Sequence, residues 1–306
     1  MFFTKKSGVQ MLSLLGMALD GVFLSGQVQA QGVDTVERIM KTHVINLGVR
    51  DLSPPFSTLD KNGKAVGYSV DICYKLVEQM RKDLKLTDLK AQEVVVTASN
   101  RLDKIKDGSI DLECGSTVIT KPRLKDVDFS YAVMFGAQRF LTTPSAGIDS
   151  QVNLAGKTVA VVKGSTGEKI VNALKAGEIP TLKVLSVASN DEALAALETG
   201  KVQAISQMDV ILQFVRLKSK TPEHFLVTQW PLTVEPIGFP VRKGDPRFLN
   251  LVNESMKTLF GQTEFRTLYD KWFYQQVKIP PSALMMENMH RPSANPGMSF
   301  VGGAEL

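Results

Sequence analysis

The sequence predicts an α/β protein of two lobes, and three observations support this prediction. The 306 residues of the chain correspond to about two domains. Its 43% hydrophobic and 22% charged residues are typical of a globular protein with enough apolar content for large cores. Strand-like and helix-like segments alternate along the chain, which favours βαβ units and largely parallel sheets. The alternation begins again near Lys157, so we expect a second set of elements and a second lobe.

The first residues have the pattern of an export signal. Two lysines precede an apolar stretch over residues 11–24, and Val28 and Ala30 place small residues at the two positions that a signal peptidase reads. We therefore expect residues 1–30 to be a signal peptide that is cleaved near Ala30. Asp20 interrupts the apolar stretch and leaves an uncleaved signal anchor as the alternative. No later segment approaches the roughly 20 apolar residues that a membrane-spanning helix needs.

Apolar periodicity predicts the elements of the first part. Val70, Cys73, Val77 and Met80 lie at helical spacing, whereas residues 44–49 form a short run that is typical of a strand. In this part we expect strands over residues 44–49, 93–96 and 109–114, and helices over residues 69–81 and 100–106.

The second part continues the same alternation. We expect a helix over residues 191–199, with Asn190 as its N-cap. Gly200, directly after residue 199, is a residue type that commonly ends a helix. We expect strands over residues 158–162, 182–187, 204–207 and 237–241, and helices over residues 166–175, 191–199, 210–218, 246–259 and 263–273. Residues 281–306 have little periodicity and are rich in Pro, Asn, Gly and Met, which predicts an extended C-terminal tail.

Two segments, residues 135–144 and 233–241, are placed to carry the chain between the lobes. They bracket a continuous second lobe with its hinge strands, residues 137–240. The first lobe is then discontinuous and consists of residues 31–136 and 241–280. Two crossing segments between lobes form a hinge.

The net charge of +5 does not predict a nucleic-acid partner. Nucleic-acid binders gather Lys and Arg into stripes, whereas here acidic residues interrupt the basic stretches, as Asp107 does after Lys104 and Lys106. We interpret these charges as a solvated surface.

The two cysteines and three histidines have no metal-ligand spacing, so we expect neither a metal nor a cofactor. The histidines are His43, His224 and His290. Cys73 falls on an expected helix and Cys114 at the end of an expected strand, and both positions favour burial. An exported protein can form disulfides, but spacing cannot show whether two side chains meet. We expect buried free thiols, with a disulfide as the alternative.

Two strand-to-helix junctions, one in each part of the chain, are rich in glycine and hydroxyl residues. They are residues 114–117 (Cys-Gly-Ser-Thr) and residues 163–167 (Lys-Gly-Ser-Thr-Gly). Glycine lets the backbone approach a ligand closely, and free N–H groups at a helix start attract an anion. Ligands bind at the carboxyl ends of strands in open α/β sheets, so the two junctions together predict a carboxylate site. Each junction alone is better explained as a turn with a helix cap, and neither has the ending of a phosphate loop.

Arg101 opens a further expected helix, directly after Asn100. Its guanidinium is a rigid fork that suits bidentate binding of a carboxylate. Position alone favours the alternative of a surface arginine with a solvated head.

A series of short motifs between residues 35 and 280 resembles a known family. The motifs are Arg50, Pro-Pro-Phe at 54–56, Gly-Tyr-Ser-Val-Asp at 67–71, Ser-Asn-Arg at 99–101, Gly-Ser-Ile-Asp at 108–111, Glu-Cys-Gly-Ser-Thr at 113–117, Arg123, Phe-Ser at 129–130, Leu-Ala-Gly-Lys at 154–157, Gly-Ser-Thr-Gly-Glu at 164–168, Gly238, Arg-Lys-Gly-Asp at 242–245 and Trp-Phe at 272–273. In this order they resemble periplasmic solute-binding protein family 3, the substrate-binding proteins of polar amino-acid ABC transporters. The glutamate/aspartate-binding branch looks closest.

The resemblance implies a type II periplasmic binding protein fold with a two-segment hinge, and it implies roles for matching residues. Arg101 would hold the α-carboxylate of the ligand, helped by the backbone at Ser116 and the hydroxyl of Thr166. Arg50 would meet the side-chain carboxylate of an acidic ligand, and Phe56 would line the cleft.

Four positions depart from the pattern of the acidic-ligand branch. Ala98 replaces a serine, Val118 replaces a hydroxyl residue and Asn190 stands where the branch has a histidine. Met208 stands where the family has the aspartate that holds the ammonium group of the ligand, and we expect Asp209, one place on, to serve instead. The anion-binding half of the site is thus intact, whereas the ammonium-binding half depends on Asp209.

We therefore expect a monomeric periplasmic protein that delivers glutamate, aspartate or a related organic acid to a membrane ABC permease, and not an enzyme. One alternative is a binder of a dicarboxylate that lacks the amine. Another is a dehydratase on the same fold, with Glu168 as general acid, although Glu168 is better explained as a residue that caps or packs its helix. A sensor domain is disfavoured, because no membrane-spanning helix or second module follows.

Overall fold

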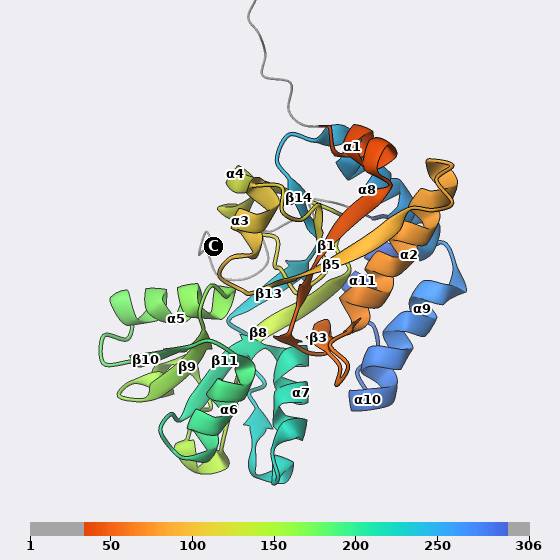
Figure 1. Cartoon of the computed structure of the whole chain (residues 1–306). Coiled ribbons are helices and arrows are strands. Elements are labelled where there is room, and N and C mark those ends of the chain that lie inside the picture. The colour runs from red at the N-terminus through yellow and green to blue at the C-terminus, as the bar shows by residue number, and fades with distance from the viewer. Residues whose placement is uncertain (1–33, 293–306) are drawn as a thin grey trace, which may run out of the picture. The chain divides into compact units, whose positions relative to one another are not determined.

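The computed structural model describes residues 34–292, which lie in one compact unit. The expected signal peptide, its cleavage near Ala30 and the last part of the expected tail fall outside the described residues. Within this range, no helix combines the length and the apolar character needed to cross a membrane. Figure 1 shows two groups of strands and helices that are joined by long strands.

The first group is built on a parallel sheet of three strands in the order β5-β1-β6. The strands are β1 (Val44–Arg50), β5 (Lys90–Val96) and β6 (Leu112–Glu113). Helix α2 (Tyr68–Asp83) buries Ile72, Leu76 and Met80 at helical spacing. The short helix α3 (Arg101–Lys106) follows β5. These elements agree with the strand and helix pattern expected from the sequence.

The second group is built on a larger mixed sheet in the order β10-β9-β11-β8-β12, with β13 also paired to β8. Its strands are β8 (Met134–Thr142), β9 (Thr158–Val162), β10 (Lys183–Val187), β11 (Ala204–Met208), β12 (Leu226–Val227) and β13 (Thr233–Ile237). Its helices are α5 (Thr166–Ala176), α6 (Asn190–Glu198) and α7 (Asp209–Lys218). Strands β9, β10 and β11 are parallel, whereas β8 runs antiparallel to its neighbours.

Strands β8 and β13 are the two segments that pass between the groups. They pair antiparallel, from Thr233 opposite Gln138 to Ile237 opposite Met134. Each continues into the first group, where β7 (Val127–Phe129) pairs with β14 (Pro240–Arg242). Two adjacent crossing strands are the arrangement expected for a hinge.

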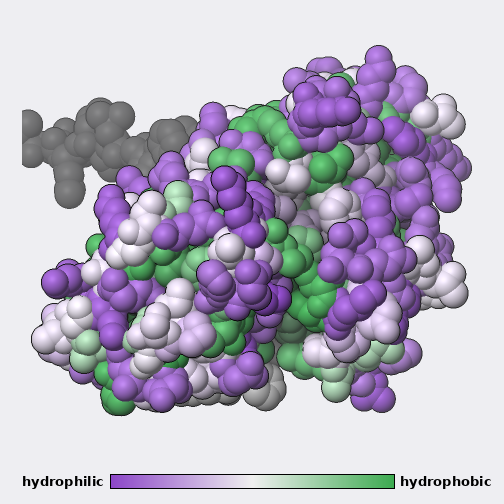
Figure 2. Space-filling model, turned by 90° about the horizontal axis from the view of Figure 1, so that it is seen from below, coloured by the Kyte–Doolittle hydropathy of each residue, from purple (hydrophilic) through white to green (hydrophobic). Residues whose placement is uncertain are grey.

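The remaining elements cover the sheets or connect them. They are α1 (Thr35–Thr42), β2 (Leu52–Ser53), β3 (Ser57–Leu59), β4 (Ala65–Val66), α4 (Arg123–Asp126), η1 (Pro144–Ala146), η2 (Gln151–Leu154), η3 (Pro222–His224), α8 (Pro246–Phe260), α9 (Thr263–Tyr269), η4 (Asp270–Tyr274), α10 (Gln275–Val277) and α11 (Ala283–His290). Figure 2 shows a face that is largely hydrophilic, with hydrophobic residues along a hollow near its middle.

Helix α11 corrects the expectation of an extended tail from residue 281 onward. Ser282 caps this helix, because its hydroxyl accepts a hydrogen bond from the N–H of Met285. Met285 is buried, and the side-chain amide of Asn288 donates to the carbonyl of Ala132 at 2.8 Å. Contacts with the rest of the fold therefore hold a helix that local periodicity did not predict.

Cys73 on α2 and Cys114 after β6 form a disulfide, which corrects the expectation of free thiols. Both residues are buried, as expected. The sequence could not show the bond, because it depends on how α2 packs against the end of β6. A further correction concerns α6, whose N-cap is Ser189 rather than Asn190. The hydroxyl of Ser189 accepts from the N–H of Glu192, and Asn190 is the first residue of the helix.

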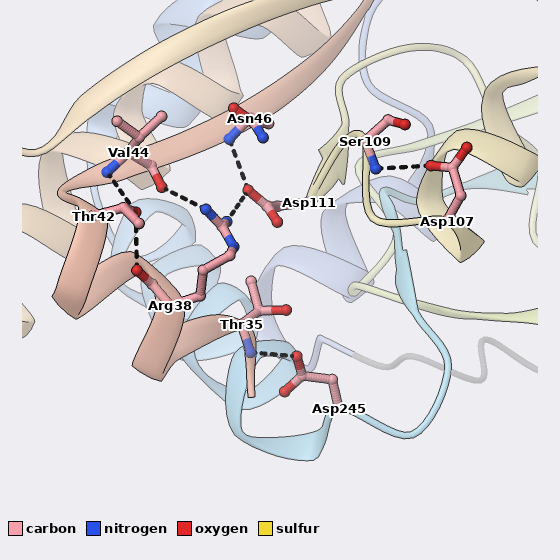
Figure 3. Close-up of polar contacts among 9 residues, drawn as sticks. All are labelled: Thr35, Arg38, Thr42, Val44, Asn46, Asp107, Ser109, Asp111 and Asp245. Atoms are coloured by element: carbon pink, nitrogen blue, oxygen red, sulfur yellow. Dashed lines mark hydrogen bonds and ion pairs between the residues drawn. The ribbon is translucent and has the colours of Figure 1, made fainter. Parts of the chain in front are cut away.

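Asp111 ties helix α1 to the start of β1 (Figure 3). Its carboxylate accepts a hydrogen bond from the N–H of Asn46 at 2.7 Å and forms an ion pair with Arg38. Burial raises the pKa of Asp111, and the bond from Asn46 and the charge of Arg38 act in the opposite direction. Asn46 lies near the start of β1, whereas Arg50 ends the strand, so Asp111 serves the framework.

We expect Asp111→Ala to lower the free energy of unfolding by about 1–3 kcal/mol, because it leaves the partly buried N–H of Asn46 without its acceptor and Arg38 without its ion-pair partner. Urea denaturation of wild type and variant measures this difference. Asp107→Ala is the matched control, because Asp107 is exposed and accepts only from the N–H of Ser109 within this network. Equal stability of Asp111→Ala and wild type would contradict the framework role.

Candidate functional site

A cavity of about 180 Å³ lies between the two sheets. It is lined by residues at the carboxyl ends of β1, β9 and β11 and by the loops and helix starts that follow them. Parallel strands place such ends at one edge of their sheet, which is the usual position of a ligand site in α/β proteins. The cavity is of a size that admits a small molecule.

Three arginines from the first group face this cavity. Arg50 ends β1, Arg101 begins α3 and Arg123 begins α4, and they are only 8%, 3% and 5% exposed. Burial lowers the pKa of all three, and in Arg101 burial together with the charge of Arg123 lowers the pKa to about 9. Desolvated cations are costly unless they meet an anion, so the cavity is built for a negatively charged ligand.

The arginines have few protein partners, and most of those are neutral. The Nε of Arg101 donates to the hydroxyl of Thr117, and its Nη1 has no hydrogen-bond partner among the described residues. The Nη1 of Arg123 donates to the carbonyl of Val118 at 2.8 Å, and its Nη2 donates to the carbonyl of Gly164 at 3.2 Å. The Nε of Arg50 likewise has no partner within residues 34–292. Donors are therefore left for a ligand.

The negative charge of Glu113 partly compensates the positive charge of the three arginines. Its side chain is fully buried, and its charge favours the protonated forms of Arg50, Arg101 and Arg123. Gly115 leaves the necessary room, because a Cβ at this position would collide with the Glu113 carboxylate. Glycine at this position therefore provides space for the Glu113 carboxylate, whereas it adopts no positive φ.

The second group contributes two helix starts. Ser165 caps α5 by accepting from the N–H of Glu168 at 3.1 Å, and Thr166 is the first residue of the helix. Thr166 and Asn190 line the cavity at the starts of α5 and α6. Their free backbone N–H groups add positive potential to the site.

The two groups touch directly at Gly164. Its φ of +78° favours glycine, and a Cβ there would lie 2.7 Å from the carbonyl oxygen of Ala98. The hydrogen bond from Arg123 to the Gly164 carbonyl spans the same gap. The cavity is thus closed on this side by contacts between the first and second groups.

Five of the seven predicted site residues line the cavity: Arg50, Arg101, Ser116, Thr166 and Asn190. The hydroxyl of Ser116 hydrogen bonds to that of Ser53 at 2.9 Å. The side-chain oxygen of Asn190 accepts from the amide of Gln207 at 3.2 Å.

The prediction that Phe56 lines the cleft was wrong. Phe56 is fully buried, and its ring packs against Tyr68 and Phe273 with centroids 6.1 and 5.8 Å apart. It belongs to the hydrophobic core of the first group.

Asp209 also does not line the cavity. Its Oδ1 accepts from the N–H groups of Ala137 and Val210 at 3.1 and 2.8 Å, and its Oδ2 lies 3.5 Å from the Nε of Arg139. As the first residue of α7, it turns toward the hinge strand β8 and a different cavity, which Tyr269 also lines. Met208, Val118 and Ala98 line the first cavity as expected from their positions and give it an apolar wall.

The sequence analysis assigned no site role to Arg123 and overlooked Glu235. Arg123 appeared there only as part of a motif. Glu235 lies on the hinge strand β13, is 2% exposed and lines the cavity. Burial raises its pKa to about 7, whereas Thr166 and Arg123 act in the opposite direction. A charged residue inside the strand Thr233–Ile237 was the signal that could have revealed it.

Comparisons with known proteins agree with this architecture. A family described as bacterial extracellular solute-binding proteins, family 3, matches residues 45–275. The chain is 35% identical to an L-glutamate/L-aspartate-binding protein of Pseudomonas aeruginosa, over 93% of this chain and 96% of that one. It is 31% identical to a glutamate/aspartate import solute-binding protein of Escherichia coli, over 90% of each chain.

Solved structures show the same fold. An ancestral amino acid-binding protein, described as a precursor of cyclohexadienyl dehydratase, has a TM-score of 0.67 at 30% identity and covers 78% of this chain and 99% of its own. The solute receptor for L-cysteine of Neisseria gonorrhoeae has a TM-score of 0.69 at 27% identity and covers 80% of this chain and 97% of its own. These likenesses confirm the predicted two-lobe α/β fold. On the family match and the two relatives above 30% identity, the chain belongs to the bacterial extracellular solute-binding proteins, family 3.

Proposed function

We propose that this protein captures an acidic amino acid, of the glutamate or aspartate type, and presents it to a membrane ABC permease. The observation that carries the proposal is the set of three buried arginines that face one small cavity with donors to spare. Two carboxylates match such a cluster better than one, because each guanidinium fork holds one carboxylate bidentately. The printed functions of the relatives in Pseudomonas aeruginosa and Escherichia coli support the same ligand class.

In the proposed complex the two ends of the ligand have different partners. Arg101, the backbone at Ser116 and the start of α5 at Thr166 hold the α-carboxylate. Arg50 and Arg123 hold the side-chain carboxylate. Because Arg101 and Thr166 belong to different groups, a ligand that reaches both favours the closed arrangement.

The two sheets and the crossing strands support a division into two lobes. We place the first lobe at residues 31–136 and 241–280 and the second at residues 137–240. Flexing of β8 and β13 would open and close the cavity. The protein would work as a monomer in the periplasm, after export and removal of residues 1–30, with no nucleic-acid partner.

Binding without catalysis is supported by the position of Glu168. The Oε2 of Glu168 accepts from the N–H of Gly164 at 2.7 Å, and Ser186 donates to its other oxygen. The carboxylate therefore caps its own helix, and it is absent from the cavity lining. Glu168, the general acid of the dehydratase alternative, is therefore not placed to contact a molecule in the cavity.

A second candidate ligand is a dicarboxylate without an amine, such as glutarate. The apolar side chains of Met208 and Val118 favour it, because they present no acceptor for an ammonium group. The three arginines would serve this ligand equally well.

We expect glutamate or aspartate to raise the melting temperature of the purified protein. A ligand at about 100 times its Kd stabilises the folded state by about 2.7 kcal/mol through mass action. A thermal-shift series with acidic, neutral and basic amino acids and with glutarate tests the ligand class. Arginine or glutamine as the strongest stabiliser would contradict the proposal, and glutarate alone would establish the second candidate.

A further inference from the structure

An amino-acid ligand brings an ammonium group into this cavity, and that group needs an acceptor. An ammonium that is removed from water without a hydrogen-bonded partner is strongly destabilised. Met208 has no acceptor to offer, and the carboxylate of Asp209 is engaged with Ala137, Val210 and Arg139. The cavity must supply the acceptor from another element.

The strand register places Glu235 beside Met208. On β8, Gly136 stands opposite Glu235 of β13, and Gln138 stands opposite Met208 of β11. Residues 136 and 138 share one face of the sheet, because side chains alternate along a strand. A Cβ at Gly136 would collide with the side chain of Met208, so Met208 leans over the glycine toward β13. Met208 and Glu235 thus lie on one face, on either side of β8, and both line the cavity.

Glu235 is also free to accept. It is 2% exposed, and neither carboxylate oxygen meets the distance and angle of a hydrogen bond to a described residue. The hydroxyls of Thr166 and Thr233 are near enough to lower its pKa, and they leave acceptor capacity for a ligand.

The other carboxylates that line the cavity are placed differently. Asp51 directly follows Arg50 in the chain, and its charge favours the protonated form of Arg50. Glu192 is exposed, and its carboxylate accepts a hydrogen bond from the N–H of Ala188 at 3.0 Å.

We propose that Glu235 accepts the ammonium group of the ligand and thereby selects amino acids over acids that lack the amine. The inference rests on the proposed acidic amino-acid binding. A carboxylate on the hinge strand β13 would take the place of one on β11, and Met208 would serve as the apolar wall beside it. Gly136 leaves room for Met208 between them, because a Cβ at this position would overlap the Met208 side chain and force it to move.

The charges around Glu235 give this interaction a pH signature. The titratable groups that face it are Arg123 of α4 and Asp209 of α7, and burial raises its pKa to about 7. A pKa near neutrality means that the empty site holds a proton on Glu235 in part of the molecules at pH 7. The ligand ammonium favours the charged carboxylate, so glutamate binding releases this proton. Glutamate affinity should rise between pH 6 and pH 8, whereas glutarate affinity should stay level or fall.

The experiment is calorimetric titration of wild type, Glu235→Gln and Glu254→Gln with glutamate and with glutarate. Glutarate has both carboxylates and lacks only the amine. We expect Glu235→Gln to lower glutamate affinity roughly 10- to 100-fold, and to leave glutarate affinity unchanged or higher. Glu254→Gln is the control, because this carboxylate is exposed, pairs with Lys257 on α8 and is not part of the cavity lining. It should change neither affinity more than about threefold.

Titrations of wild type in buffers of different ionisation enthalpy count the released protons without any variant. Release with glutamate at pH 7 and none with glutarate supports the proposal, even if Glu235→Gln fails to fold. Equal losses for both ligands in Glu235→Gln would make Glu235 only a counter-charge of Arg123 and overturn the inference. An unchanged glutamate affinity would also overturn it and leave the proposed function standing. A wild type that binds neither glutamate nor aspartate would defeat the proposed function itself.

Discussion

Arg101→Ala lowers the affinity for the acidic ligand by about 2–5 kcal/mol, or roughly 30- to several thousand-fold, in the result that we expect. Arg101 is 3% exposed, its Nε is fixed by the hydroxyl of Thr117, and its Nη1 has no partner among the described residues. The side chain is therefore held in place beside the cavity, with a donor that has no protein partner within the described residues. Calorimetric titration of wild type and variant with glutamate measures the loss.

Two further variants separate the geometry of Arg101 from its charge. Arg101→Lys keeps one positive charge but loses the planar fork, so we expect it to bind much more weakly than wild type. Lys106→Ala removes a cation at the end of the same helix, where Lys106 pairs with Asp103 at the surface, and should have little effect. An Arg101→Ala affinity within tenfold of wild type would show that the carboxylate anchor lies elsewhere.

The parts of the fold that the sequence predicted are those encoded by local pattern. Alternating apolar segments located the strands of both sheets, because a buried strand and an amphipathic helix have different periods. The segments at Ser116 and Thr166 were found because helix starts after strands concentrate glycine and hydroxyl residues. Helix α5 does begin at Thr166, whereas the prediction of a helix start after Ser116 was wrong, since the chain runs from β6 to α4 without a helix. Arg50 and Arg101 were assigned through the family resemblance, and the structure brings both to the cavity.

The side-chain positions that the sequence did not predict depend on contacts between different segments of the chain. The Phe56 ring packs against Tyr68 and against Phe273, and Phe273 is far away in the sequence. Asp209 was expected to turn toward the ligand, but the backbone of the hinge strand at Ala137 holds its carboxylate. The burial of Glu235 follows from the position of β13 beside β8, which no local pattern reveals.

The hinge strand β13 would then have two roles. In the proposed scheme β13 carries the chain between the lobes and also holds the carboxylate that receives the ligand ammonium. A ligand with an amine would draw together Glu235 on the hinge, Arg101 in the first lobe and Thr166 in the second. An acid without the amine would engage only the last two, so the ligand that fits best is also the one that fixes the hinge.

Removal of the Cys73–Cys114 disulfide should lower the free energy of unfolding by about 4 kcal/mol. The bond closes a segment with a sequence separation of 41, and such a cross-link restricts the unfolded chain to that extent in the chain-entropy description. The double variant Cys73→Ala, Cys114→Ala avoids leaving a lone thiol, and its melting temperature should fall by roughly 8–16 °C.

Wild type in a reducing agent is the matched control, because it should lose similar stability while the double variant stays unaffected. The affinity for glutamate should change far less than in Arg101→Ala, since neither sulfur faces the cavity. Equal melting temperatures of oxidised wild type and the double variant would show that the bond does not stabilise the fold.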